Sequence, residues 1–189
     1  MENNNNPGNS ENPYVFVAMG SDSDLPVMSA AVKLLDDLKI PRRLMILSAH
    51  RTPDKLFELA EWAEKQESLC AAVLGAGGAA HLPGMFASKV TLPVIGVPIK
   101  TSTLSGVDSV WSILQMPPGI PVATMAINGS RNAGILAAQI VSQRYPGFRE
   151  KLRDHKQKLV DSVDEKNESL KELDYAEYLA RELHLNKTQ

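Results

Sequence analysis

Five apolar segments recur along the chain, each followed by a polar or glycine-rich link and then by a segment with helical periodicity. The apolar segments cover residues 14–19, 44–47, 69–74, 93–97 and 122–127. Segments that are apolar at nearly every position are typical of strands buried on both faces of a parallel sheet. The alternation therefore predicts an α/β fold, in which a five-stranded parallel sheet carries helices on both of its faces.

The segments between the strands have the periodicity and the start signals of helices. In residues 25–38, apolar side chains recur at Met28, Ala31 and Leu35, which places them on one helical face. The next helix is predicted to start at Thr52-Pro53, because proline suits the first helical position. The remaining predicted helices cover residues 83–89, 107–115 and 130–144.

The links that follow the five strands are predicted to meet at one edge of the sheet. They comprise residues 20–24, 48–51, 75–81, 100–106 and 128–132. Parallel strands point the same way, so the links at their carboxyl ends gather where open α/β folds bind ligands. We therefore expect one shared site built from these links.

The third link belongs to an unusually bare stretch, GAGGAAHLPGM at residues 75–85. Glycine lets a ligand approach the backbone closely, and the amides of such a loop can donate to an anion or a polar ring. Packing alone gives no evident reason for so few side chains, so we expect a small molecule to lie here. A tight structural turn without a ligand is the alternative. A dinucleotide site is a poor match, because no acidic residue follows about 20 positions later.

Composition restricts the partners and the compartment. The net charge is −2 and no basic stripe is present, so a nucleic-acid partner is not expected. No apolar stretch is long enough to cross a bilayer, and the first residues lack the pattern of a signal peptide. The single cysteine, Cys70, lies in an apolar segment and is predicted to be a buried, inert thiol. These features predict a cytoplasmic protein.

The chain is expected to divide into three parts. Residues 1–13 are polar and are predicted to be a disordered lead-in, and residues 14–145 form the α/β domain. Residues 146–189 form a helical tail, in which residues 148–163 are predicted to be an amphipathic helix and residues 170–180 a second helix-like run. His155 and His184 lie in this charged tail and are expected to have no chemical role.

Five motifs in order along the chain resemble one enzyme family. They are GSDSD (20–24), SAHRTP (48–53), GAGGAAHLPGM (75–85), SGVD (105–108) and SILQMP (112–117). Together they are similar to the N5-carboxyaminoimidazole ribonucleotide mutase family of purine biosynthesis, the class I PurE family. The resemblance covers residues 15–145 and implies a flavodoxin-like three-layer sandwich.

The resemblance also implies the reaction and the assembly. N5-carboxyaminoimidazole ribonucleotide is rearranged to 4-carboxy-5-aminoimidazole ribonucleotide without a cofactor, a metal or ATP. The family forms a homo-octamer whose active sites lie at subunit junctions, and a helix equivalent to the tail packs on neighbouring subunits. Two acids on one turn, Asp22 and Asp24, are too few to indicate a metal site.

The resemblance assigns roles to residues on the first three links. Ser21, Ser23 and Arg51 are suited to binding the substrate phosphate. Asp24 is suited to accepting hydrogen bonds from the ribose hydroxyls, although a simple helix cap is an alternative role for it. The full set of predicted substrate-binding residues is Ser21, Ser23, Asp24, Ser48, Ala49, Arg51, Gly77, Gly78, Ala79, Ala80, His81 and Leu82.

His50 is the predicted catalytic residue. The implied mechanism passes through decarboxylation to aminoimidazole ribonucleotide and enclosed carbon dioxide, so protons must move at the departing nitrogen and at C4. An imidazole is suited to both transfers near neutral pH. Residues 75–82 are expected to line the substrate ring and to hold carbon dioxide away from water. His81 either touches the migrating carboxylate or braces this loop.

Three other functions remain open at this stage. Directly carboxylating relatives yield the same product but have lysine in place of Arg51 and an Arg-Ser-Asn type loop in place of residues 75–84. A flavodoxin-like FMN electron carrier shares the fold, and so does a non-catalytic nucleotide-binding module. The chain also departs from the family at residues 128–131, where its link is shorter than expected, and at residues 164–189, where its tail is longer.

Overall fold

The computed structural model describes residues 12–186, so most of the predicted lead-in at residues 1–13 lies outside the described residues. A five-stranded parallel sheet forms the centre, with the strand order β2-β1-β3-β4-β5. The strands are β1 (Tyr14–Met19), β2 (Arg42–Ile46), β3 (Leu69–Gly77), β4 (Val94–Ile99) and β5 (Ala123–Thr124). The predicted parallel α/β fold is confirmed.

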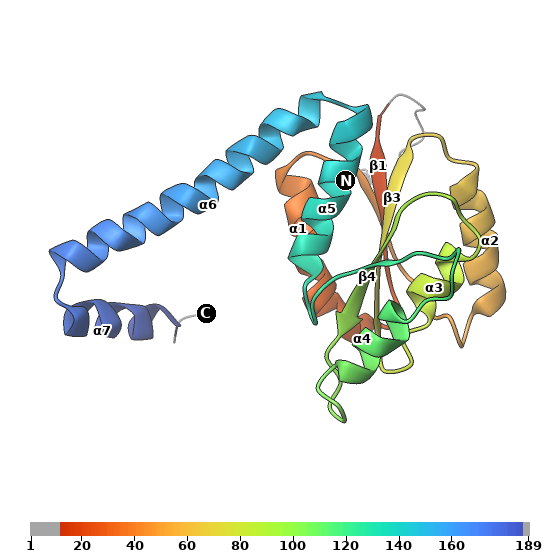
Figure 1. Ribbon diagram of the computed structural model, residues 1–189, viewed down its shortest axis with the longest axis horizontal. Helices are drawn as coiled ribbons and strands as arrows, with labels where there is room; N and C mark the ends of the chain where they lie inside the picture. The colour runs from red at the N-terminus through yellow and green to blue at the C-terminus, as the bar shows by residue number, and fades with distance from the viewer. Residues whose placement is uncertain (1–11, 187–189) are drawn as a thin grey trace, which may run out of the picture. The chain divides into compact units, whose positions relative to one another are not determined.

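Helices cover both faces of this sheet (Figure 1). Helices α1 (Leu25–Asp37) and α5 (Ser130–Arg144) lie on one face. Helices α2 (Pro53–Glu64), α3 (Leu82–Ala87) and α4 (Val107–Leu114) lie on the other. Every one of these helices begins within two residues of its predicted start.

The alternation of side chains along β1 supplies both halves of the core. Phe16 points to the face that carries α2 and α3, where its ring stacks on Phe86 with 5.6 Å between the ring centroids. Its neighbours Val15 and Val17 are also fully buried, on the opposite face. Burial on both faces explains why this strand is apolar at every position.

The second and fifth strands differ from the prediction because they are the edges of the sheet. Strand β2 begins at Arg42 rather than at residue 44, since an edge strand tolerates charged side chains. Strand β5 spans two residues, whereas the sequence predicts residues 122–127 as a strand. Pro98 of β4 accepts a hydrogen bond from the Asn128 amide but has no amide hydrogen of its own, so the regular β4–β5 ladder ends after Gly96.

The third strand runs through the first half of the glycine-rich stretch. Gly75, Ala76 and Gly77 pair with β4, so they are strand residues and not loop residues. A Cβ atom on Gly75 would lie 2.5 Å from Sδ of Met28 in α1. The expectation that packing does not require glycine here is therefore wrong at Gly75, because α1 packs directly against its backbone.

The contacts divide the described chain between Arg149 and Glu150 into two compact units. Helix α6 (Gly147–Glu172) begins just before this boundary and continues beyond residue 163, where the predicted helix ends. Residues 164–172 include glutamate and lysine, which favour a helix, and contain no proline or glycine. Helix α7 (Tyr175–Asn186) starts after Asp174, whose carboxylate accepts the amide hydrogens of Ala176 and Glu177. No helix among the described residues combines the length and the apolar character that crossing a bilayer requires.

Candidate active site

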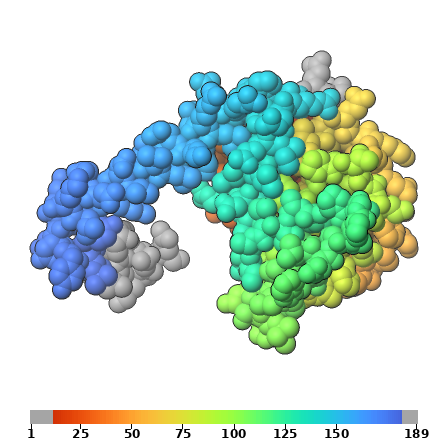
Figure 2. Space-filling model, in the orientation of Figure 1, coloured from red at the N-terminus to blue at the C-terminus, as the bar shows by residue number. Residues whose placement is uncertain are grey.

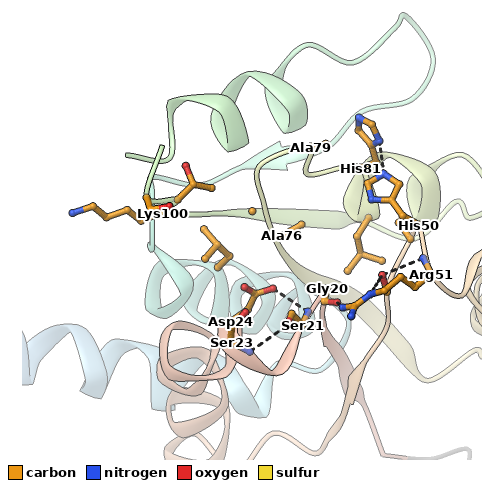
Figure 3. A pocket seen from close by; sticks show the side chains of 17 residues that line it. Gly20, Ser21, Ser23, Asp24, His50, Arg51, Ala76, Ala79, His81 and Lys100 are labelled. Carbon is orange, nitrogen blue, oxygen red and sulfur yellow. Dashed lines mark hydrogen bonds between the residues drawn. The ribbon is translucent and has the colours of Figure 1, made fainter. Parts of the chain in front are cut away.

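A pocket of about 580 Å³ opens at the carboxyl edge of the sheet, where the sequence predicts a shared site (Figure 3). Four strand ends contribute to it. Its lining consists of Gly20, Ser21, Ser23, Asp24, Ser48, Ala49, His50, Arg51, Ala76, Gly77, Ala79, His81, Leu82, Ile99, Lys100, Thr101 and Ser102. The topology explains the convergence, because β1, β2, β3 and β4 are neighbours and point the same way.

The turn after β1 is held by a reciprocal capping arrangement. The Ser21 amide donates to Oδ2 of Asp24 at 3.1 Å, and the Ser23 amide donates to Oγ of Ser21 at 3.4 Å. Together they form a capping box around the short 3₁₀ helix at Asp22–Asp24. Within the described chain, the Asp24 carboxylate makes no capping bond to α1. Its role as a cap is thus confined to this turn, and it also lines the pocket.

The pKa values of the two acids in this turn are shifted in opposite directions, for different reasons. Asp24 is 8% exposed, and the loss of hydration raises its pKa above the ordinary value for aspartate. Asp22 lies at the surface, where a hydrogen bond from the Ser21 hydroxyl lowers its pKa. The ionised Asp24 carboxylate therefore lowers the free energy of unfolding. It also provides a strong hydrogen-bond acceptor inside the pocket.

Asp24→Asn is expected to raise the free energy of unfolding at neutral pH. The pKa of Asp24 is higher in the folded state than in the unfolded state, so ionising this carboxyl destabilises the fold. The destabilisation is absent at pH values below the unfolded pKa and complete at pH values above the folded pKa. The stability gain of the variant over the wild type should therefore widen as pH rises through this window. Urea unfolding of both proteins at several pH values checks this, and a gap that stays constant or narrows would contradict it.

The link after β2 presents a guanidinium group that is already oriented. Nε of Arg51 donates to Oγ of Ser48 at 3.2 Å, and Nη2 donates to the carbonyl of Gly20 at 3.3 Å. The second contact ties this link to the turn after β1. With two of its nitrogens engaged, the Arg51 side chain has little conformational freedom left to lose.

Two histidines from different links contact each other directly. Nε2 of His50 lies 2.8 Å from Nδ1 of His81, with the rings edge to face and their centroids 4.9 Å apart. One of these nitrogens must donate and the other accept, so the two facing atoms share a single proton. Figure 3 shows this pair apart from the Ser21–Asp24 turn, so the pocket has a basic aromatic part and a polar part. The pairing itself could not be read from the sequence.

Two of the predicted ligand-binding residues do not line the pocket. Ala80 is 1% exposed and belongs to the core. Gly78 has a left-handed backbone (φ 68°), and its amide donates to Oγ of Ser109 at 2.9 Å. The His81 amide donates to the carbonyl of Ala79 at 2.8 Å. These two loop amides are therefore committed to the protein itself, contrary to the expectation that they serve a ligand.

The pocket also includes residues outside the predicted substrate-binding set. From the link after β4 come Lys100, Thr101 and Ser102, and Gly20, Ala76 and Ile99 also contribute. The position of the fourth link after a strand was the available signal. The fifth link does not reach the pocket. Instead, Oδ1 of Asn128 accepts the amide hydrogen of Lys100 at 2.9 Å and so supports the fourth link.

Two further kinds of reactive group, metal-ligand clusters and the Cys70 thiol, also bear on the chemistry of the described residues. Across residues 12–186, no cluster of three or more histidine, cysteine, aspartate or glutamate side chains is arranged to hold a metal ion. Cys70 is half-buried, and burial raises the pKa of its thiol, which disfavours the reactive thiolate.

Proteins of known name are similar to this chain over most of its length. The family model described as AIR carboxylase matches residues 14–162. The N5-carboxyaminoimidazole ribonucleotide mutase of Thermotoga maritima is 53% identical over 167 residues, which cover 88% of this chain and 97% of the relative. The phosphoribosylaminoimidazole carboxylase of Schizosaccharomyces pombe is 49% identical over 90% of this chain, but the match covers only 31% of that longer protein.

A solved structure of Treponema denticola PurE has the same architecture. It superimposes with a TM-score of 0.77 at 26% identity and covers 84% of this chain and 99% of its own. The sheet, the helices that cover it and the pocket-forming links all lie within residues 14–162, which the family model matches. On the strength of a family match and a relative that each span most of the sequence, the chain belongs to the AIR carboxylase family.

Proposed function

We propose that the protein is an N5-carboxyaminoimidazole ribonucleotide mutase, which moves a carboxyl group from the exocyclic nitrogen to C4 of the imidazole. The observation that carries the proposal is that His50 opens into the same pocket as Ser21, Asp24 and Arg51. That pocket combines groups for a ribose phosphate with one group that can exchange a proton. The names of two relatives, matched over 97% and 96% of their own lengths, support the same reaction.

The polar part of the pocket is assigned to the ribose phosphate. Ser23 and Arg51 supply hydroxyl and guanidinium donors for the phosphate oxygens, and the Ser21 hydroxyl, which donates to Oδ1 of Asp22 in this structure, can rotate to join them. Asp24 supplies an acceptor for the ribose hydroxyls, and its carboxylate is already held by the Ser21 amide. The preformed geometry supports this assignment, because few side chains need to be ordered when the ligand binds.

His50 is assigned the proton transfers. When the N–carboxyl bond breaks, carbon dioxide leaves and the nitrogen takes a proton from His50. When C4 then attacks carbon dioxide, a carbon–carbon bond forms, and the proton on C4 returns to His50. One imidazole thus ends in its starting state, as an isomerisation requires. His81, at hydrogen-bond distance, holds the His50 ring and fixes the tautomer.

The walls beside the histidines are assigned to the carbon dioxide intermediate. They consist of small or aliphatic residues, Ala76, Gly77, Ala79, Leu82 and Ile99. A small apolar wall excludes water and offers no strong partner to a neutral molecule, which favours its capture by C4 over its escape. The same composition makes a polar or charged intermediate a poor fit.

Direct carboxylation of aminoimidazole ribonucleotide is the second candidate, since the Schizosaccharomyces pombe relative carries a carboxylase name. We infer the mutase reaction from Arg51 and from the GAGGAA stretch at residues 75–80, of which Ala76, Gly77 and Ala79 line the pocket. Both differ from the lysine and the polar loop of directly carboxylating relatives. Sequence identity to the two kinds of named relative is similar and does not decide between them.

Labelled bicarbonate should hardly enter the product during turnover of the N5-carboxylated substrate. A mutase returns the carboxyl group that it removed, so the label in solution stays outside the pocket. Mass spectrometry of the C4-carboxylated product measures the incorporation, with ATP omitted throughout. Extensive labelling, or efficient use of aminoimidazole ribonucleotide at low bicarbonate, would assign the protein as a carboxylase instead.

The purified protein also distinguishes the mutase from two functions that transfer no carboxyl group, a flavin carrier and a nucleotide-binding module. A flavin carrier commonly stacks aromatic side chains on its cofactor, but the pocket-lining residues of the described chain include no phenylalanine, tyrosine or tryptophan. A yellow purified protein would favour the flavin carrier. A nucleotide-binding module would need Ser21, Asp24 and Arg51 but not His50, and it would bind the substrate without converting it.

We also propose a cytoplasmic homo-octamer. Leu104, Val107, Trp111 and Leu114 form an apolar stripe over α4 and the loop before it, each between 49% and 56% exposed, in a segment that lies at the surface (Figure 2, green). Helix α6 has no buried residue within its described length, although Leu159 and Val163 on it are apolar. Stripes of this kind support burial against other copies of the chain.

Light scattering of the purified protein is expected to give the mass of eight chains. The apolar stripe on α4 provides a matched test, because Trp111→Glu places a charge in the expected interface and should reduce the mass. Lys33→Glu, a charge change at an exposed position of α1 away from both stripes, serves as the control. A fully active monomer at working concentration would contradict the proposal.

A further inference from the structure

Two serines of α4, Ser109 and Ser112, form hydrogen bonds to the backbone of Gly78. Its amide donates to Oγ of Ser109 at 2.9 Å, and its carbonyl accepts from Oγ of Ser112 at 3.1 Å. The Ser112 hydroxyl also lies 2.8 Å from the carbonyl of Asp108, so its single hydrogen is shared between two acceptors. Of the two serines, Ser109 therefore holds the turn more strongly.

Ser109 also connects this turn to the next strand. Its hydroxyl donates to the carbonyl of Ile99 at 2.7 Å while its oxygen accepts from Gly78. The side chain is fully buried and does not line the pocket. Gly77 and Ala79, on either side of Gly78, do line the pocket, and so does Ile99. One buried hydroxyl thus joins two walls of the pocket.

The same turn of α4 holds the fourth link as well. The Thr101 hydroxyl lies 2.9 Å from Oδ1 of Asp108, and the Gly106 amide donates to Oγ of Thr101 at 3.4 Å. Side chains from one turn of α4 therefore fix Gly78 in the third link, Ile99 at the end of β4 and Thr101 in the link after it. A left-handed residue such as Gly78 is held in place by its surroundings rather than by its own backbone preference.

We propose that Ser109, assisted by Ser112, is a positioning residue that keeps the Gly77–Gly78–Ala79 wall closed around carbon dioxide. This inference rests on the proposed function. After the N–carboxyl bond breaks, carbon dioxide either bonds to C4 or escapes, and escape leaves aminoimidazole ribonucleotide in the pocket and bicarbonate in solution. A wall that moves by a fraction of an ångström favours escape, because capture depends on the alignment of the two reacting atoms.

Ser109→Ala is expected to lower kcat by about 10–100-fold while KM stays within about threefold. KM should change little because Ser21, Asp24 and Arg51 lie on other links. The diagnostic result is leakage: more label from bicarbonate enters the product, and free aminoimidazole ribonucleotide appears. Ser112→Ala should show the same pattern more weakly, and Ser112→Thr, which keeps the hydroxyl, should restore wild-type values.

Ser142→Ala is the matched control. Ser142 is also buried and donates to a backbone carbonyl, that of Gln139, but it lies in α5 away from the pocket. The Ser142→Ala variant shows the general effect of removing a buried serine hydroxyl. It should not change the escape of carbon dioxide from the pocket. If Ser109→Ala does not fold, the half-buried Ser112 variants decide the question alone.

Amide hydrogen exchange of a peptide covering residues 75–85 gives a readout independent of catalysis. Exchange should accelerate in Ser109→Ala and not in Ser142→Ala. Tightly coupled turnover in folded Ser109→Ala and Ser112→Ala, with unchanged exchange, would overturn the inference. If the wild type itself does not convert the N5-carboxylated substrate, the proposed function fails and the catalytic role of Ser109 fails with it, whereas hydrogen exchange still decides whether Ser109 positions the wall.

Discussion

His50→Asn is expected to lower kcat by about 10²–10⁴-fold, the usual contribution of a general acid–base residue. Asparagine retains a polar side chain of similar reach but cannot exchange a proton near neutral pH. Affinity for the C4-carboxylated product should change by less than about tenfold, because phosphate and ribose contacts are assigned to Ser21, Asp24 and Arg51. Steady-state kinetics and calorimetric titration with the product measure the two effects separately.

The structure provides controls for this result. His50 and His81 are both exposed at the pocket, so losing their mutual hydrogen bond should change the free energy of unfolding by no more than about 0.5 kcal/mol. His155→Asn, in the second unit, should retain full activity. His81→Asn should reduce kcat less than His50→Asn does, because it removes the partner that orients the ring rather than the proton carrier. Near-normal turnover in His50→Asn would remove His50 from the mechanism.

Alanine at Gly75 and at Gly77 should affect different properties, although the two glycines are adjacent on one face of β3. At Gly75 the added Cβ would lie 2.5 Å from Sδ of the fully buried Met28, and overpacking of this kind costs about 1–3 kcal/mol. At Gly77 the nearest atoms, on Ile99 and Thr101, are 3.6 Å away, which is ordinary contact. Gly75→Ala should therefore destabilise the fold, whereas Gly77→Ala should not.

Ligand binding should respond in the opposite way, with a larger effect of Gly77→Ala than of Gly75→Ala. Gly77 lines the pocket and Gly75 does not, so a methyl group at Gly77 reduces the room for the ligand and should weaken its binding about tenfold or more. Chemical unfolding and ligand titration of both variants measure the two effects. Met28→Ala should reduce the cost of Gly75→Ala by making room for its methyl group. Equal destabilisation by both substitutions would contradict this division of roles.

The sequence alone was sufficient to predict the class of fold and the edge at which the site lies. Strand and helix periods are local properties, so the apolar run at residues 14–19 and the helix starts near Leu25 and Pro53 could be read directly. Parallel strands then bring the links that carry Asp24, His50 and Arg51 to one edge, whatever the strand order. The motifs on those links also carried the resemblance to the family.

The tertiary structure decided what depends on distances between segments far apart in the chain. The bare sequence of residues 75–85 predicts a ligand surface, with a tight structural turn as the alternative. In the structure, Gly75 is small because α1 passes against it, and the Gly78 amide bonds to Ser109. The contact between His50 and His81 likewise joins two links whose spacing in the sequence carries no sign of it. Periodicity reports which face of an element is apolar, whereas the identity of the atoms opposite a given backbone position is fixed only when the elements pack together.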